Sequence, residues 1–230
     1  FFKWFLYSGQ KPHPSGNVED YRTRLNEFAQ KMGHYTYIDS AGNLLIKINA
    51  TKGKENVSPF LLQSHLDQVD TRVTKEEPYE KWLNVPIYNV LEDGGIKGLN
   101  SSNGADGQSG IAVMMAIAEH HTNFTHGPIE LLCTVDEETI MSGAIGLEEN
   151  LLKSKYYICL DGFMMNDLII GSASVIIQYY LLEVELNLFY AYKYNIELSG
   201  FKSGHSGLTI QDNKANSFKW LAIFLTNLNE

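Results

Sequence analysis

Three consecutive carboxylates give the first indication of chemistry in this chain of 230 residues. Asp136, Glu137 and Glu138 directly follow the apolar run 129–135, which is typical of a buried strand. Adjacent carboxylates repel one another unless a positive charge lies among them. Because open α/β sheets place their ligands at the carboxyl ends of strands, a metal ion is the simplest source of that charge. A solvated acidic loop is the alternative for this stretch taken alone.

Two more apolar runs lead into side chains that can bind a metal ion. The short strand predicted at 60–63 leads into His65 and Asp67, whose side chains point to one side in extended backbone. Such an imidazole can bind a metal through one ring nitrogen while an acid fixes its orientation, although an ordinary surface pair is the alternative. A second buried strand, predicted at 156–160, ends on Asp161.

A glycine-rich turn at 104–110 carries a further acid, Asp106, and opens an apolar helix predicted at 111–118. The lysine of a phosphate-binding P-loop, the glycine spacing of a dinucleotide fold and the alternating acids of a calcium loop are all absent from this segment. Asp106 therefore suits a ligand that bridges two metal ions, with a simple helix N-cap as the alternative.

The alternation of short strands with helical segments predicts how these side chains meet. It indicates an α/β fold, a three-layer α/β/α sandwich with a largely parallel sheet, in which the acids and the histidine converge along one edge. One imidazole with several carboxylates is the ligand set of a hydrolytic site, usually of two ions. We expect zinc, with manganese or cobalt as alternatives.

The remaining patterns outline the rest of the first domain. Apolar residues at three- and four-residue steps predict a helix at 18–32 with Asn17 as its N-cap, followed by a hairpin at 35–38 and 44–48. The segment 71–99 reads as a loop with a small hairpin. Five further residues are predicted to lie outside the chemistry: His120, His121 and His126 on the surface, and Cys133 and Cys159 as reduced residues of the core.

The composition restricts the class of protein. A net charge of −9 and a pI near 5.3 argue against a nucleic-acid or anionic-membrane partner. No apolar run approaches the roughly 20 residues of a membrane helix, and the aromatic opening is too short for a secretory signal, so a cytoplasmic location is expected. The chain begins without Met and ends inside an apolar helical pattern, which suggests a fragment of a longer protein.

The four motifs together resemble a known family. Residues 64–67 (Ser-His-Leu-Asp), 104–107 (Gly-Ala-Asp-Gly), 136–138 (Asp-Glu-Glu) and 159–162 (Cys-Leu-Asp-Gly) are similar, in order, to the metal-site motifs of the dinuclear-zinc exopeptidases. Within this family, the chain is similar to the aminoacyl-histidine dipeptidase (Xaa-His dipeptidase) branch, and the segment 126–130 also resembles that branch. The resemblance implies hydrolysis of dipeptides of the Xaa-His type.

The resemblance also implies a ligand set. His65 and Asp161 would bind different metal ions, Asp106 would bridge the two ions, and Glu138 would be a further ligand. A metal ion lowers the pKa of a water molecule that it binds, so that a nearby carboxylate can complete its deprotonation.

The same resemblance implies roles for two more residues, and the chain differs from the family's usual pattern at three positions. Asp67 resembles the acid that orients His65, and Glu137 resembles the general base that takes a proton from water and later protonates the leaving amine. Ser64 stands where the family usually has Gly, and Gly107 where this branch usually has Asn. Asp136 replaces a more usual Thr, and its charge is expected to raise the pKa of Glu137.

The last segment resembles the start of the family's lid. The sequence divides into a metal-binding domain at 1–174 and a partial lid and dimerisation domain at 175–230, with strand-like alternation at 184–198 and an apolar helix at 215–225. Within the lid, His205 would reach the substrate, and the full-length protein is expected to form a homodimer. Because the family's returning catalytic segment is absent, an inactive fragment or metal-binding remnant is the main alternative. A tripeptidase or an amidohydrolase acting on N-acyl amino acids is the second.

Overall fold

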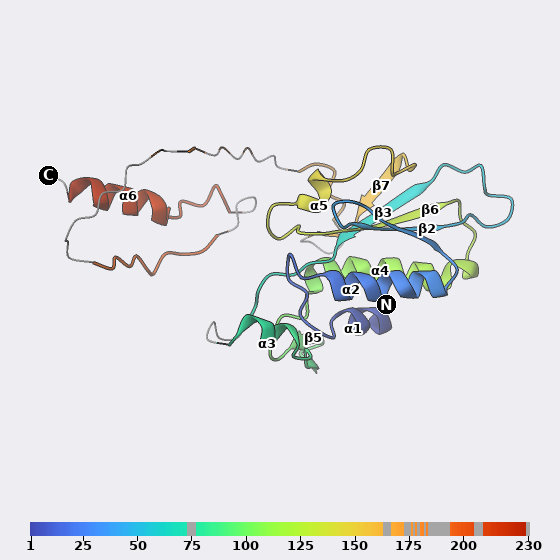
Figure 1. Cartoon of the computed structure of the whole chain (residues 1–230), viewed down its shortest axis with the longest axis horizontal. Helices are drawn as coiled ribbons and strands as arrows, with labels where there is room; N and C mark the ends of the chain where they lie inside the picture. Colours follow the sequence, from blue (N-terminus) through green and yellow to red (C-terminus); the bar gives the residue numbers. More distant parts are fainter. Residues whose placement is uncertain are drawn as a thin grey trace. The chain divides into compact units, whose positions relative to one another are not determined.

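The computed structural model describes residues 1–72, 77–162, 167–172, 176, 178, 180–181, 183, 194–204 and 209–228. The chain divides into two compact units, Phe1–Asn166 and Asp167–Glu230. The first unit contains a mixed sheet of five strands together with the helices that cover it (Figure 1). Along the sheet, the strands lie in the order β1 (Tyr35–Ile38), β2 (Leu44–Ile48), β6 (Ile129–Thr134), β3 (Phe60–His65) and β7 (Tyr156–Cys159).

The sheet has a parallel half and an antiparallel half. Strand β3 pairs in parallel with both β6 and β7, whereas β1 pairs antiparallel with β2, and β2 antiparallel with β6. The predicted hairpin of β1 and β2 is confirmed, and so is the α/β fold class. The three parallel strands are those that lead into the predicted site residues, so their carboxyl ends meet at one edge.

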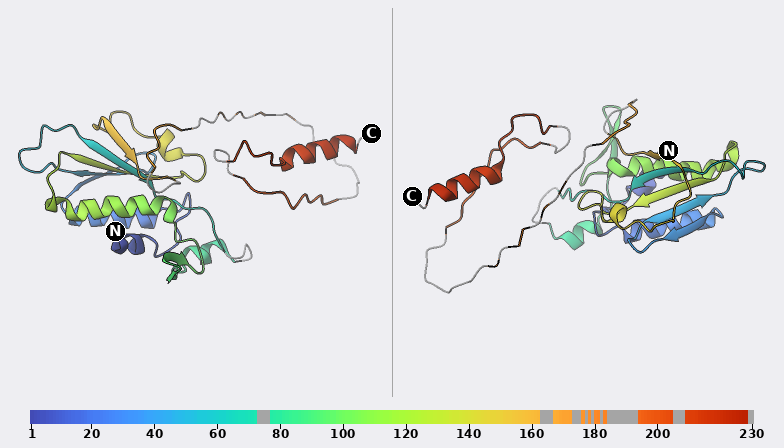
Figure 2. Two further views of the ribbon diagram at one scale, coloured as in Figure 1. Left: turned by 180° about the vertical axis from the view of Figure 1, so that it is seen from behind. Right: turned by 90° about the horizontal axis from the view of Figure 1, so that it is seen from above.

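Two helices, α2 (Glu19–Lys31) and α4 (Ala105–His120), cover one face of the sheet (Figure 2). Helix α1 (Phe2–Ser8) packs against α4 on the side away from the sheet. Side chains of a strand alternate between its two faces, so every second residue of β2 and β6 joins the core beneath these helices. Leu25, Ile46, Ile111 and Leu131, all 0% exposed, are members of that core.

The opposite face is closed by the chain that follows β6. Ile129 and Leu131 point into the helical core, so Glu130 between them points the other way. Its carboxylate is buried and accepts hydrogen bonds from the backbone N–H groups of Lys153 and Ser154, each 2.9 Å at its shortest. Lys47, its cross-strand partner, lies 3.2 Å away. These bonds hold the segment that leads into β7 against the sheet. The short helix α5 (Ser142–Ile145) precedes that segment.

Several local predictions need correction. Helix α2 begins at Glu19 with Val18, and not Asn17, at the N-cap position, and it has no side-chain cap. The Asn17 amide nitrogen donates to the Tyr79 hydroxyl at 3.0 Å. Strand β7 was predicted to be buried, yet its four residues are exposed. It is the last strand of the sheet and has β3 as its one partner within the described residues. Cys159, at its end, is therefore exposed, whereas Cys133 is buried as predicted.

The segment between β3 and α4 is more structured than expected. It contains the predicted hairpin, β4 (Asn89–Glu92) with β5 (Gly95–Gly98), and also a short helix, α3 (Tyr79–Leu83), that the sequence did not indicate. Helix α1 was likewise not predicted. In the described part of the chain, no helix has the length and apolar character needed to cross a membrane.

The second unit contains helix α6 (Ser217–Asn227), which confirms the helix predicted there. Its N-cap is Asn216, whose side-chain oxygen accepts from the backbone N–H of Lys219 at 3.1 Å. Most of the strand-like alternation predicted for this unit, 184–193, lies outside the described residues. The described remainder, 194–198, forms no strand.

Candidate metal centre

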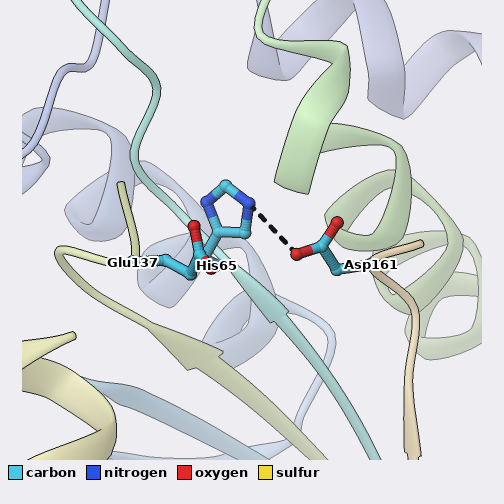
Figure 3. Close-up of side chains that lie close together, drawn as sticks. All are labelled: His65, Glu137 and Asp161. Atoms are coloured by element: carbon cyan, nitrogen blue, oxygen red, sulfur yellow. Dashed lines mark ion pairs between the residues drawn. The ribbon is translucent and has the colours of Figure 1, made fainter. Parts of the chain in front are cut away.

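The strand ends bring the predicted side chains to one place. His65 is the last residue of β3, Asp161 follows β7 by two residues, and Glu137 and Glu138 follow the end of β6. In Figure 3 the imidazole of His65 is turned toward the carboxylate of Asp161, and the dashed line marks their contact of 3.7 Å. Asp106, from the start of α4, approaches the same ring nitrogen, with 3.1 Å between His65 Nε2 and Asp106 Oδ1.

Two overlapping groups of ligand atoms result. His65, Glu137 and Asp161 form one, and His65, Asp106 and Glu138 form the other, with the ligand atoms of each group within 4.8 Å of one another. Imidazole nitrogens and carboxylate oxygens bind zinc at about 2.0–2.2 Å, so ligand atoms at this spacing need only small movements to close around an ion. The structure thus gathers the four predicted metal ligands and the predicted base.

Asp106 reaches the site because the start of α4 is not helical. Asp106 has φ −64° and ψ 124°, and Gly107 has φ 72° and ψ −48°, so the regular helix begins only after them. No side chain caps this helix start by a hydrogen bond, and Asp106 Oδ1 faces His65 instead, so Asp106 is not a simple cap. Gly107 combines a left-handed φ with close packing: a Cβ at this position would lie 2.6 Å from Cε1 of the His65 ring.

The orientation of His65 depends on the chain just beyond it. Nδ1 lies 2.9 Å from the backbone oxygen of Asp67, which can only accept, so Nδ1 carries a proton and donates it. Nε2 then faces Asp106 and Asp161. The Asp67 carboxylate lies 3.6 Å from Nδ1, close to the ring as expected. Its hydrogen bonds, however, come from Ser15 and from the backbone N–H groups of Glu137 and Glu138.

The ionisable groups of the site show that it favours a cation. Burial lowers the pKa of His65, but hydrogen bonds to Asp106 and Asp67 and the charge of Asp161 outweigh burial and raise it to about 11. The carboxylates therefore stabilise a positive charge at Nε2, which is the position from which a metal ion would contact the same oxygens. This donor set fits a divalent ion of the zinc type.

The carboxylates themselves differ according to their surroundings. Burial is the main cause that raises the pKa of Glu137, Glu138 and Asp161, and neighbouring carboxylates add to it. The hydrogen bond from His65 instead lowers the pKa of Asp106. Burial alone would raise the pKa of Asp67, but the neighbouring His65 imidazole and the hydrogen bonds from Ser15 and the two backbone N–H groups outweigh it and lower the pKa to about 2.

Asp136 was expected to raise the pKa of Glu137, but in the structure it makes other contacts. The pKa of Glu137 is raised as predicted, but by burial and by Asp161, Asp106 and Asp67. The carboxylate of Asp136 accepts from the backbone N–H of Gly16 at 2.8 Å and from the hydroxyl of Ser142 at 2.6 Å. Asp136 therefore joins the acidic turn to the loop at 13–17, a contact that the sequence analysis missed.

His120, His121 and His126 belong to neither of these two groups. His120 is exposed, as predicted. His121 and His126 are partly exposed, and each donates from Nδ1 to a backbone oxygen, that of Ala118 and that of Gly127. His205, predicted to contact substrate, lies outside the described residues.

Comparisons with known proteins show what this chain is similar to. No family model matches the chain. The chain is 32% identical over 216 residues to the cytosol non-specific dipeptidase of Escherichia coli (strain K12), which covers 93% of this chain and 44% of that protein. The structure of the aminoacylhistidine dipeptidase from Vibrio alginolyticus matches with a TM-score of 0.64 and 32% identity, over 70% of this chain and 32% of that one. Aminopeptidase PepT from Bacillus cereus ATCC 10987, 24% identical with a TM-score of 0.60 over 70% of this chain and 42% of that one, shares the fold.

The chain thus spans less than half the length of these relatives. Its likeness to the Escherichia coli protein extends over nearly all of its own residues, and the four motifs that form the site lie within the unit of Phe1–Asn166. The chain belongs to the exopeptidase family that includes aminoacylhistidine dipeptidase.

Proposed function

We propose that this chain carries the metal centre of a metal-dependent exopeptidase that hydrolyses dipeptides of the Xaa-His type. The observation that carries the proposal is the convergence of His65 with four carboxylates, three that follow parallel strands and Asp106 from the start of α4, in two groups whose ligand atoms lie within 4.8 Å of one another. The similarity to two proteins named as dipeptidases supports the reaction class and the small peptide substrate.

Four side chains would hold the ions. His65, Asp106, Glu138 and Asp161 are the proposed ligands, with Asp106 between the two ions, and zinc suits this mixture of nitrogen and oxygen donors. When bound, the metal polarises the scissile carbonyl and lowers the pKa of the attacking water.

Glu137 is the proposed general base. Its burial and the surrounding carboxylates raise its pKa, which brings its affinity for a proton closer to what proton transfer near neutral pH requires. Its carboxylate takes a proton from the attacking water and then donates it to the amine that leaves. Its backbone N–H is held by Asp67 at 3.1 Å, so the base is anchored to the same carboxylate that lies beside His65.

The rest of the proposal extends beyond the metal centre. We assign the metal-binding part to 1–174 and a partial lid and dimerisation domain to 175–230, in which His205 would contact the substrate. The complete protein would act in the cytoplasm as a homodimer, in line with the location in the name of the Escherichia coli relative.

A comparison of three proteins tests the proposal. Zinc content and hydrolysis of β-alanyl-histidine are measured for the wild type, Asp106→Ala and Glu137→Gln. Wild type and Glu137→Gln should bind equal amounts of zinc, whereas Glu137→Gln should be slower by about 10² to 10⁴, the usual worth of a general base. Asp106→Ala should bind less zinc. Equal zinc in the wild type and Asp106→Ala would refute the metal centre, and a preference for Xaa-Xaa dipeptides without His would refute the narrower specificity.

A further inference from the structure

The loop at 13–17 lies against the metal centre although it contributes no ligand. It runs beside the chain that follows β3: Gln68 donates its backbone N–H to His13 at 3.1 Å, and Pro14 forms a parallel bridge with Gln68. The loop turns back on itself through a bond of 2.8 Å from the N–H of Asn17 to the oxygen of Pro14. Ser15 and Gly16, at the tip of this turn, point at two carboxylates of the site.

Ser15 contacts Asp67. Its hydroxyl donates to Asp67 Oδ2 at 2.6 Å, the usual length of a charge-assisted bond from a hydroxyl to a carboxylate, which is stronger than a bond between neutral groups. The Asp67 side chain is 0% exposed, so no water competes for that oxygen. The same carboxylate accepts from the consecutive N–H groups of Glu137 and Glu138, both at 3.1 Å. Ser15 thus fixes the plane of the carboxylate that holds the turn bearing the base and a metal ligand.

Gly16 contacts the other side of the same turn. Its N–H donates to Asp136 Oδ1 at 2.8 Å, and the Ser142 hydroxyl donates to Asp136 Oδ2 at 2.6 Å. Asp136 has a left-handed φ of 58°, a conformation that costs free energy for a non-glycine residue and needs support from its surroundings. The acidic turn is therefore held at its start through Asp136 and at its next two peptides through Asp67.

We propose that Ser15 is a positioning residue of the metal centre, acting through Asp67 on the side chains of Glu137 and Glu138. This inference rests on the proposed metal site. Without the Ser15 hydroxyl, the Asp67 carboxylate can turn about its χ2 axis, and the two N–H groups that it holds then shift with it. The loss of a residue that hydrogen-bonds a metal ligand typically weakens metal binding about 10- to 100-fold. Ser15 acts one residue further out, through Asp67, so we expect Ser15→Ala to fall near the lower end of that range, about 10-fold.

The chain offers a matched control. Ser154 also donates its hydroxyl to a buried carboxylate, Glu130 Oε2 at 2.7 Å. This bond lies on the face of the sheet opposite the helices, and neither residue belongs to the two ligand groups. Ser154→Ala removes a bond of the same kind and should lower the free energy of unfolding without changing metal affinity. Ser15→Thr and Ser15→Val form a second comparison, nearly equal in size and different in the hydroxyl.

In the test, each metal-free protein is titrated with Co²⁺, and the visible absorption of the bound Co²⁺ reports the affinity. Urea unfolding of each variant measures its stability. We expect weaker Co²⁺ binding for Ser15→Ala and Ser15→Val, near wild-type binding for Ser15→Thr, and wild-type binding for Ser154→Ala. Equal Co²⁺ affinities for the wild type and for folded Ser15→Ala and Ser15→Val would overturn this inference and leave the proposed metal centre intact. A loss for Ser15→Ala no larger than that for Ser154→Ala would also overturn it, because the effect would then be one of general stability. A wild type that binds no Co²⁺ would overturn the proposed metal centre and this inference together.

Discussion

Replacing Asp67 by Asn should change the stability of the protein in a way that depends on pH. The carboxylate is buried and accepts from one hydroxyl and two backbone N–H groups. An amide keeps the shape but has one acceptor oxygen, so at least one of these donors must face an NH₂ group. Burying an unpaired donor and losing the charge both favour the unfolded chain.

The pKa of Asp67 sets the magnitude. A carboxyl whose pKa is 3.8 in the unfolded chain and about 2 in the folded protein contributes about 2.5 kcal/mol to the free energy of unfolding at neutral pH. The folded pKa lies below the unfolded one, so the unfolded chain binds more protons between these values. This contribution is therefore complete above about pH 5, falls to roughly half near pH 3 and is lost as the pH drops through about 2.

Urea unfolding followed by circular dichroism, in the presence of a chelator and at pH values from 3 to 7, measures this effect. Asp67→Asn should be less stable than the wild type by about 2 kcal/mol at pH 7, and the difference should shrink toward pH 3. Glu27→Gln, on the exposed side of α2, is the matched carboxylate-to-amide control. Parallel pH profiles for the wild type and Asp67→Asn would show that this carboxylate is not stabilised by the contacts described, and the reasoning would fail.

Three further substitutions have distinct expected outcomes. Gly107→Ala places a Cβ against the His65 ring at a left-handed φ, whereas Gly33→Ala has the same left-handed φ but open space around it. Gly107→Ala should therefore lower the free energy of unfolding in urea by about 1–3 kcal/mol more than Gly33→Ala. Equal losses would contradict the close packing at Gly107. Glu130→Gln should lose about 1–3 kcal/mol, because its buried oxygens accept from Lys153 and Ser154, and a change below about 0.5 kcal/mol would show that this tie does not stabilise the fold. Asp106→Ala should reduce the Zn²⁺ bound per chain, measured by elemental analysis, and should also lower the urea midpoint, because His65 loses its partner at Nε2. Unchanged zinc would remove Asp106 from the ligand set.

The amino-acid sequence by itself determined where the chemistry lies along the chain. An apolar run followed by acids or by His-X-Asp is a local pattern, and strands that are parallel neighbours must bring their carboxyl ends to one edge. For this reason His65, Glu137, Glu138 and Asp161 could be assigned to one site before any coordinates, and Asp106 could be added from its turn. The hairpin of β1 and β2 and the helices α2, α4 and α6 follow from equally local patterns.

The tertiary structure decided which partner each side chain finds. Strand β7 has the same apolar pattern as β3 and β6 but is exposed, because its place at the end of the strand order leaves one side without a neighbour in the described residues. Asn17 was expected to cap α2, yet Val18 has the N-cap position, and the Asn17 amide nitrogen donates to Tyr79, 62 residues further along the chain. Asp136 reads as one more charge in an acidic run, but it binds Gly16, 120 residues away. Such contacts cannot be read from local periodicity, because they depend on how distant segments pack, and packing places each polar group beside whichever donor or acceptor the fold brings within reach.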